Sequence, residues 1–236
     1  MALIPPVHLR EFERIVFFTG AGLSAESGLA TYRGEGGIWN EYRLEEYACQ
    51  AAFDRDPDKV WDFHDKRREK VASVAPSTGH EVIARVEAEK PGTRVITQNI
   101  DGLHQRAGNK QVTELHGSLW RIRCPRTGEV QENHEAPIRS RVCASGCHWR
   151  PDIVWFGDML RPECLLAAQE ALEQSDCLVS VGTSAAVQPA ADLPRIAMAG
   201  GAVTVEINLE DTPVTHLYQH PLRGNASQWL EALWNG

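Results

Sequence analysis

Four short runs of β-branched and other apolar residues, each ending in a glycine or polar cluster, stand out along the chain. They occupy residues 14–22, 93–101, 176–184 and 202–210. Apolar runs without polar alternation are typical of parallel strands that are buried on both faces. The stretches "GHEVIARVEAEKPG", "PECLLAAQEALEQS" and "QPAADLPRIAMAGG" lie between or after these runs and place apolar residues at helical intervals. The pattern therefore predicts an α/β fold built on a doubly wound parallel sheet.

The polar clusters that end the four runs fall where such a fold binds ligands. In doubly wound sheets the binding site lies at the carboxyl ends of the strands. Glycine, asparagine and threonine also end strands for purely structural reasons. Four clusters together with the loop at Gly20 favour a binding site over that alternative.

Two segments do not fit the sheet. Residues ~35–75 are rich in Trp, Tyr, Arg and Glu at helical spacing, and residues ~118–151 hold three cysteines, several prolines and little periodicity. We expect these segments to form a smaller satellite domain. The first one stands where a dehydrogenase would carry its second strand and an acidic residue for the ribose, so the chain departs from that enzyme class.

Composition narrows the range of partners. The chain has 236 residues and a formal net charge of −8, which argues against nucleic acid as the main partner because phosphate binding needs a concentrated basic surface. The short basic cluster "KRREK" at residues 66–70 is interpreted as a solvated helix face. The N-terminus lacks the features of an export signal, and no apolar run reaches the ~18 residues of a membrane span. We expect a soluble, cytoplasmic protein.

The six cysteines are expected to be reduced thiols or metal ligands rather than a disulfide framework, because no export signal precedes them. Cys49, Cys164 and Cys177 are interpreted as buried apolar residues.

The stretch "GAGLSAESGLATYRG" begins like a dinucleotide-binding loop. Gly20, Gly22 and Ala25 follow a predicted strand at the spacing of the Rossmann fingerprint, in which a pyrophosphate rests on main-chain amides at a helix start. Two further stretches carry polar side chains suited to chemistry. "TQNID" brings two amides and a carboxylate to one strand end, although an Asx turn would use the same residues. "TELHGSL" holds His116, which is a possible general base, yet a single histidine is more often a structural residue.

Six stretches, "GAGLSAESGLATYRG", "TQNIDGLH", "ELHG", "VWFG", "VGTS" and "INLE", occur in the order and approximate spacing of the sirtuins, and nearly the whole chain resembles this family. The likeness is greatest to its class III branch, of bacterial and mitochondrial type. The resemblance implies an NAD-dependent protein lysine deacylase in which the acyl-lysine carbonyl oxygen displaces nicotinamide from the ribose. The products would be free lysine, nicotinamide and O-acyl-ADP-ribose. It also implies a Rossmann NAD-binding domain of residues 1–34, 76–117 and 152–236, and a satellite domain of residues 35–75 and 118–151.

Site residues follow from the same resemblance. The implied catalytic residues are His116 as general base, Asn99 and Asp101. The implied NAD-binding residues are Gly20, Ala21, Gly22, Ser24, Glu26, Thr31, Tyr32, Arg33, Gln98, Asn99, Ile100, Asp101, Gly182, Thr183, Ser184, Asn208, Leu209, Glu210 and Ala226. Val154, Phe156 and Gly157 would clamp the backbone of an acyl-lysine peptide by adding it as a strand.

The chain departs from the family pattern at the metal site. The family usually holds zinc with four cysteines, but here "CPRT" leaves Cys124 with Thr127 in place of a partner, and the second pair is Cys143 and Cys147. Three thiolates could recruit His134 or His148 as a fourth ligand, or the satellite domain could be held by packing without zinc. The sequence leaves both readings open.

The second departure concerns the acyl group. Class III enzymes that remove succinyl or malonyl groups pair a tyrosine with an arginine three residues later. Here the arginine is Arg67, but His64 stands in place of the tyrosine. Arg67 could still bind an acyl carboxylate, and His64 could add a second donor, especially when protonated. The alternative is that Arg67 belongs to the solvated face.

Two rival functions remain open at this stage. A mono-ADP-ribosyltransferase could use the same scaffold, and a non-catalytic sensor could bind NAD or ADP-ribose without turning it over.

Overall fold

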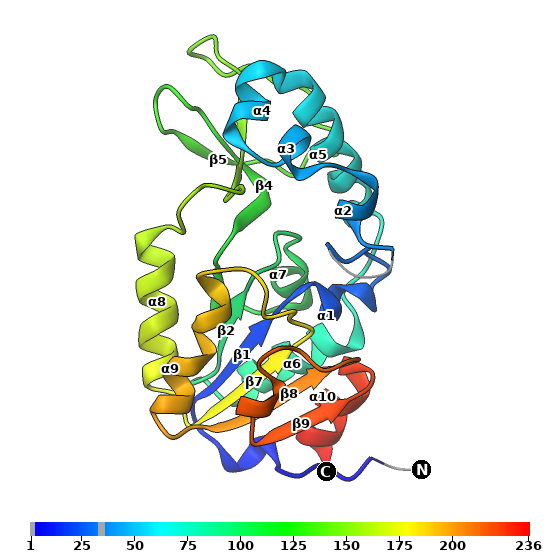
Figure 1. Ribbon diagram of the computed structural model, residues 1–236, viewed down its shortest axis with the longest axis vertical. Coiled ribbons are helices and arrows are strands. Elements are labelled where there is room, and N and C mark those ends of the chain that lie inside the picture. Colours follow the sequence, from blue (N-terminus) through cyan, green and yellow to red (C-terminus); the bar gives the residue numbers. More distant parts are fainter. Residues whose placement is uncertain (1–2, 33–35) are drawn as a thin grey trace.

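The large part of the molecule is built on a six-stranded parallel sheet (Figure 1). The computed structural model describes residues 3–32 and 36–236, and the strands run in the order β3-β2-β1-β7-β8-β9. The order reverses between β1 and β7, which confirms the predicted doubly wound sheet. The strands are β1 (Ile15–Thr19), β2 (Arg94–Thr97), β3 (Val112–Glu114), β7 (Cys177–Val181), β8 (Val203–Asn208) and β9 (His220–Arg223).

The four apolar runs contain the four inner strands of this sheet, and the two edge strands lie outside those runs. All five residues of β1 and all five of β7 are buried, as expected of strands covered on both faces. The edge strands β3 and β9 are only three and four residues long, and each has a single buried residue. Such short, half-solvated strands carry no apolar run that a sequence pattern could detect.

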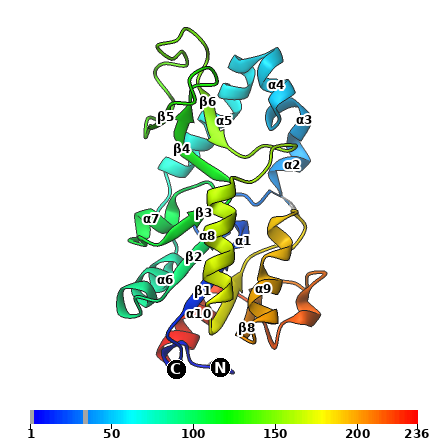
Figure 2. The ribbon, with the colours of Figure 1, turned by 90° about the vertical axis from the view of Figure 1, so that its left-hand side faces the viewer.

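Helices cover both faces of the sheet, and alternate residues of β1 contact them. Ile15 and Phe17 pack in one buried cluster with α6 and α10, while Val16 and Phe18 pack in another with α8 and α9. Figure 2 shows α8 and α9 on the near side of the sheet. The covering helices are α6 (Thr78–Glu89), α8 (Pro162–Glu173), α9 (Pro194–Ala199) and α10 (Ala226–Asn235).

Only helices lie between β1 and β2 in the described part of the chain, as the sequence predicts. They are α1 (Ala21–Ala25), α2 (Ile38–Glu41), α3 (Leu44–Tyr47), α4 (Gln50–Arg55) and α5 (Pro57–Ala72), followed by α6. Helices α2–α5 gather at one end of the molecule together with an antiparallel sheet of order β5-β4-β6 (Figure 1). That second sheet consists of β4 (Gly117–Arg123), β5 (Val130–Glu132) and β6 (Arg150–Ile153). The remaining elements are α7 (Leu103–Ala107), η1 (Leu9–Glu11), η2 (Ala190–Asp192) and η3 (Thr215–Leu217).

A tryptophan-rich core joins α5 to this second sheet. The indole N–H of Trp61 donates a 2.6 Å hydrogen bond to the carbonyl oxygen of Trp149. Both side chains belong to one buried cluster with Leu119, Trp120 and others. This end of the molecule therefore has a hydrophobic core of its own, separate from the two clusters that flank the large sheet.

The interpretation of "KRREK" as a solvated face is wrong for Arg68, which is 1% exposed. Its guanidinium donates to the carbonyl oxygens of Leu119 (2.7 Å), Asn133 (2.6 Å) and Glu135 (2.8 Å). A planar group with five donors can bind several carbonyl groups at once, and these hydrogen bonds offset the free-energy cost of burying its charge. Arg68 thus fixes α5 onto β4 and the segment after β5.

Two of the three cysteines interpreted as buried are only half-buried. Cys177 is buried within β7, but Cys49 and Cys164 are of intermediate exposure. Both stand at the start of a helix, Cys49 as the N-cap of α4 and Cys164 in the first turn of α8. Among residues 3–32 and 36–236, no helix combines the length and the apolar composition that crossing a bilayer requires.

Candidate active site

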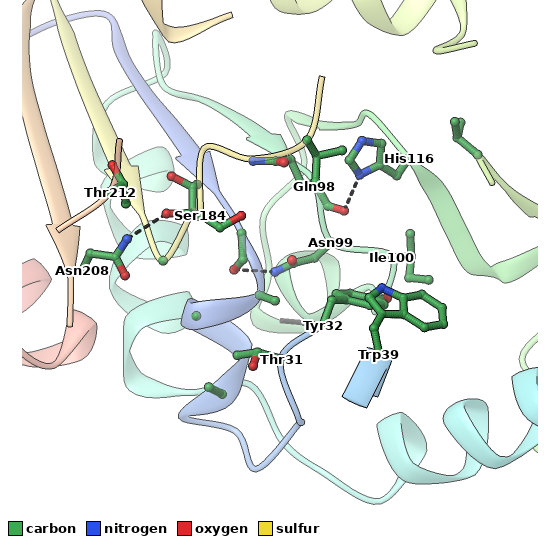
Figure 3. Close-up of a pocket in the computed structure, with 18 of the residues that line it drawn as sticks. Thr31, Tyr32, Trp39, Gln98, Asn99, Ile100, His116, Ser184, Asn208 and Thr212 are labelled. Carbon is green, nitrogen blue, oxygen red and sulfur yellow. Dashed lines mark hydrogen bonds between the residues drawn. The ribbon is translucent and has the colours of Figure 1, made fainter. Parts of the chain in front are cut away.

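A cavity of about 750 Å³ opens at the carboxyl ends of β1, β2, β7 and β8 (Figure 3). Its wall takes residues from the large sheet and from the end of the molecule that carries α2–α5. Because the strand order reverses between β1 and β7, the cavity lies at the position where doubly wound sheets bind their ligands.

Two glycine loops form the floor of the cavity and touch each other through their main chains. The amide of Gly20 donates to the carbonyl of Val181 (2.9 Å), and that of Gly22 donates to Gly182 (3.0 Å). A Cβ atom on Gly20 would lie 2.6 Å from the Gly182 oxygen, and one on Gly22 would lie 2.6 Å from the Gly182 Cα. The close approach explains why these positions need glycine, and it leaves a surface of bare main chain toward the cavity.

A chain of hydrogen bonds behind the floor holds Asn99. The Asn99 amide nitrogen donates to the carbonyl of Gly20 (2.9 Å) and to the Ser24 hydroxyl (3.1 Å), which in turn donates to Asp101 (2.8 Å). Burial raises the pKa of the Asp101 carboxyl, and its bonds from Leu103 N–H and Ser24 oppose that rise. Asn99 belongs to the cavity wall, whereas Ser24 and Asp101 lie behind it. In this structure these two residues support the wall from behind.

His116 lies in the turn between β3 and β4 and lines the cavity. Its Nδ1 is 2.9 Å from the carbonyl oxygen of Gln98 (Figure 3). A carbonyl oxygen only accepts, so Nδ1 carries the ring proton and Nε2 is left able to accept one. Burial lowers the pKa of His116 below its ordinary value, and the bond to Gln98 partly opposes this. The imidazole is therefore neutral near pH 7, as a general base must be.

A network of buried ion pairs fixes the turn that carries His116. Arg121 of β4 binds Glu114 of β3 at 2.6 Å and Asp152 of β6 at 3.2 Å. The Asp152 side chain is fully buried and also pairs with Arg161. The network ties the last strand before His116 to the second sheet.

The far side of the cavity is aromatic and contains two partly unsatisfied polar side chains. Trp39 stacks on Phe63 and meets Phe156 edge to face, at centroid distances of 6.0 and 5.9 Å. Beside them, His64 is 3% exposed, and among the described residues its ring nitrogens have no hydrogen bond of good geometry, only a weaker interaction with the backbone of Tyr47. The Nε atom of Arg67 is likewise buried without a partner, while Nη2 donates to the Tyr32 hydroxyl at 3.1 Å.

His64 can serve as the second donor in its neutral form. Burial, and then the nearby Arg67 guanidinium, lowers the pKa of His64 to about 3. The imidazole is therefore neutral and offers one N–H donor.

The opposite end of the cavity is formed by β8 and the start of α10. The Asn208 side chain donates to the carbonyl of Thr183 (2.7 Å; Figure 3), which joins β8 to the β7 loop. Glu26 accepts from the main-chain amides of Ala226 (2.7 Å) and Ser227 (3.3 Å), so its carboxylate caps α10.

Most of the predicted NAD-binding residues line this cavity. They are Gly20, Ala21, Gly22, Glu26, Thr31, Tyr32, Gln98, Asn99, Ile100, Gly182, Thr183, Ser184, Asn208, Leu209, Glu210 and Ala226. The predicted peptide and acyl residues His64, Arg67, Val154, Phe156 and Gly157 line it as well. Arg33 lies outside the described residues. Sequence reasoning did not single out Trp39, Val187, Gln188 or Thr212 for the site, because no motif marks them; Trp39 stands in the short helix α2, and the other three stand in irregular segments.

The three cysteines of the second sheet region lie together, away from the cavity. The Sγ atoms of Cys124, Cys143 and Cys147 are 3.2, 3.3 and 3.6 Å apart, close enough to bind one metal ion. Neither histidine considered as a fourth ligand joins the group within the described chain. His134 stacks on Trp120, and His148 faces Asp58 at 3.9 Å.

Comparisons with known proteins agree with this geometry. A family model described as the Sir2 family matches residues 20–189. The chain is 48% identical over 222 residues to NAD-dependent protein deacylase 2 of Pyrobaculum aerophilum, covering 92% of this chain and 88% of that protein. It is 38% identical over 252 residues to the mitochondrial NAD-dependent protein deacylase sirtuin-5 of Danio rerio, covering 94% of this chain and 83% of that one. A solved complex of a Sir2 homologue with NAD superimposes with a TM-score of 0.89 at 43% identity, over 95% of this chain and 89% of that chain.

Proposed function

The chain belongs to the Sir2 family, and from that membership we infer that it is an NAD-dependent protein lysine deacylase. One observation supports this function above the others. His116, Asn99 and the paired glycine loops surround a single cavity that also reaches Arg67 and the segment 154–157.

The residues around the cavity fit a dinucleotide. The bare main chain at Gly20, Gly22 and Gly182 allows a pyrophosphate to approach the backbone closely. Asn208, Leu209, Glu210 and Ala226 would hold the adenosine half, and Gln98, Asn99 and Ile100 the nicotinamide half. When bound, NAD supplies the ADP-ribose group that accepts the acyl group as nicotinamide leaves.

His116 acts as the general base. Its Nδ1 proton is committed to Gln98, so Nε2 is the atom that takes a proton from a ribose hydroxyl. Trp39, Phe63 and Phe156 close the aromatic side of the cavity, which keeps water from competing with the acyl group.

Arg67 gives the enzyme a preference for acidic acyl groups such as succinyl. Its Nε is buried without a partner in the described part of the chain, and a carboxylate is the natural acceptor for such a donor. The neutral His64, whose ring nitrogens have no well-formed hydrogen bond to any described residue, offers a second N–H. Two unsatisfied donors on one wall lower the cost of bringing a charged acyl group into the cavity.

The acyl-lysine peptide enters between an NAD-binding domain of residues 1–34, 76–117 and 152–236 and a satellite domain of residues 35–75 and 118–151. Val154 and Phe156 stand on the wall between these parts, but their amides already donate to His116 (2.9 Å) and Ala48 (3.0 Å). A peptide strand would therefore pair with the carbonyl groups of this segment and with Gly157.

The test uses the purified full chain with NAD and matched acetyl- and succinyl-lysine peptides, with peptide mass and O-acyl-ADP-ribose followed together by mass spectrometry. We expect His116→Ala to lose at least 100-fold in turnover, the order of a general-base contribution, while still binding NAD. The exposed His216→Ala serves as its control. Turnover by His116→Ala at the wild-type rate would remove this residue from the mechanism.

The acyl preference is tested in the same assay with Arg67→Met. We expect succinyl removal to fall at least 10-fold, because a charge-assisted bond is lost, while acetyl removal changes little. Lys66→Met removes the same charge one residue away, on the exposed face of α5, and is expected to behave as wild type. Unchanged succinyl turnover in Arg67→Met would contradict the proposed acyl pocket. Transfer of labelled ADP-ribose onto protein would favour a transferase, and absence of nicotinamide release would favour a sensor.

A further inference from the structure

The three clustered cysteines lie on two hairpin turns that face each other. Cys124 directly follows β4, and its carbonyl accepts from Gly128 N–H (2.9 Å) in the turn that leads to β5. Cys143 and Cys147 flank a three-residue loop, closed by a bond from Cys143 N–H to the Cys147 carbonyl (2.9 Å). Gly146 takes a φ of 80° in that loop, as the last position of such loops requires.

The middle residue of that loop, Ser145, directs its hydroxyl at all three sulfurs. Its Oγ is 3.2 Å from Cys124 Sγ, 3.0 Å from Cys143 Sγ and 3.1 Å from Cys147 Sγ. The Ser145 carbonyl accepts a 2.7 Å bond from Arg126, which holds the residue against the opposite hairpin. Four donor atoms therefore lie at mutual distances of 3.0–3.6 Å. Tetrahedral zinc with Zn–S bonds of about 2.3 Å would hold its sulfurs about 3.8 Å apart, close to this arrangement.

Among the described residues, the other candidates for the fourth position are less well placed than Ser145. Thr127, which occupies the sequence position of a fourth cysteine, is exposed; its hydroxyl accepts from Glu129 N–H at 3.3 Å and interacts with Cys124, whereas the Ser145 hydroxyl reaches all three sulfurs. His134 and His148 face Trp120 and Asp58 instead.

We propose that the Ser145 hydroxyl is the fourth ligand of a structural zinc site completed by Cys124, Cys143 and Cys147. Binding converts three thiols to thiolates and releases their protons to solvent. The site has one charge fewer on its ligands than a four-cysteine site, and it joins the two hairpins across the second sheet. Because a neutral hydroxyl is a weaker ligand than a thiolate, it holds zinc less tightly than four cysteines do.

The experiment uses the full chain, freed of metal by a chelator under reducing, oxygen-free conditions and then titrated with Co²⁺, whose absorption reports its ligands. The readouts are metal bound per chain, the affinity, the intensity of the thiolate-to-cobalt absorption and its response to added imidazole. The variants are Ser145→Ala, Ser145→Cys and, as the matched control for a nearby hydroxyl, Thr127→Ala.

We expect the wild type to bind one ion in a closed site whose spectrum does not respond to imidazole. Ser145→Ala binds at least 10-fold more weakly, and imidazole changes its spectrum because the fourth position is open. Ser145→Cys gains the absorption of a fourth thiolate. This result would show that residue 145 reaches the metal even if the alanine variant folds poorly. Thr127→Ala behaves as wild type. Equal affinity and equal imidazole response in the wild type and Ser145→Ala would assign the fourth position to solvent, and a wild type that binds no metal would remove the site.

Discussion

Replacing His80 with glutamine is expected to make the fold markedly less sensitive to acid. His80 is fully buried in the first turn of α6, where its Nδ1 accepts from Ser77 N–H at 3.2 Å. Its Nε2 has no partner among the described residues, and its ring meets that of His104 at a centroid distance of 4.9 Å. Glutamine is a usual residue at this position of a capping box, so the variant keeps the cap and removes only the titrating ring.

The magnitude follows from the pKa of the buried ring. Burial, and then the neighbouring His104, lowers the pKa of His80 to about 2. In the unfolded chain the pKa is about 6.5, so between these values the unfolded chain binds a proton that the folded chain does not. The free energy of unfolding therefore falls as the pH drops below about 6.5, with a slope approaching about 1.4 kcal/mol per pH unit. Between about pH 7.5 and about pH 5 this one histidine costs about 2 kcal/mol.

The assay is urea unfolding of the wild type and His80→Gln across this pH range. The difference in unfolding free energy between the two proteins cancels the contributions of titrating groups that do not contact residue 80; His104, which does, has its pKa lowered to about 4 and stays largely neutral in the folded protein over this range. It is expected to shift by about 2 kcal/mol in favour of the variant as the pH falls. The exposed His216→Gln is the control and is expected to show no such shift. A difference that stays constant with pH would mean that folded His80 accepts a proton at pH 5, and the reasoning from burial would be refuted.

Two further predictions concern the cavity. Gly22→Ala places a Cβ 2.6 Å from the main chain at Gly182, so we expect a loss of about 1–3 kcal/mol in stability and weaker NAD binding, measured by thermal unfolding and NAD titration. Gly200→Ala, whose new Cβ meets nothing closer than 3.5 Å, is expected to be neutral, and equal effects of the two variants would contradict the steric argument. Burial lowers the pKa of His116, so we expect kcat/KM to fall on the acid side with a midpoint below about pH 6.5. A pH–rate profile with a higher midpoint would exclude His116 as the base.

The strands that the sequence could predict are those with a simple physical signature. Each inner strand of the large sheet is buried on both faces and so appears as an unbroken apolar run, as in β1 and β7. The edge strands β3 and β9 are covered on fewer sides and include polar residues, so no run marks them. The motifs at the strand ends could be placed in one cavity beforehand because parallel strands bring their carboxyl ends to the same edge.

Side-chain environments were harder to predict from the sequence, because they depend on which elements pack together. Arg68 stands in a run of charges, yet three carbonyl groups from distant segments enclose it. His64 appears ionisable from its position, but burial beside Arg67 keeps it neutral. Ser145 is invisible to a search for cysteine and histidine spacing, since only the folded hairpin loop directs its hydroxyl at the three sulfurs.

The joint between the two sheets has a consequence for how ligand binding can be detected. Gly117 pairs with Ile153, and the amide of Val154 donates to the carbonyl of His116 at 2.9 Å, so the segments that cross between the sheets are themselves walls of the cavity. Any rotation of one sheet against the other strains the histidine turn and the strand beside it at once. A molecule bound in the cavity restricts this movement. We therefore expect hydrogen exchange at the Val154 amide to be slower in the bound protein than in the free protein.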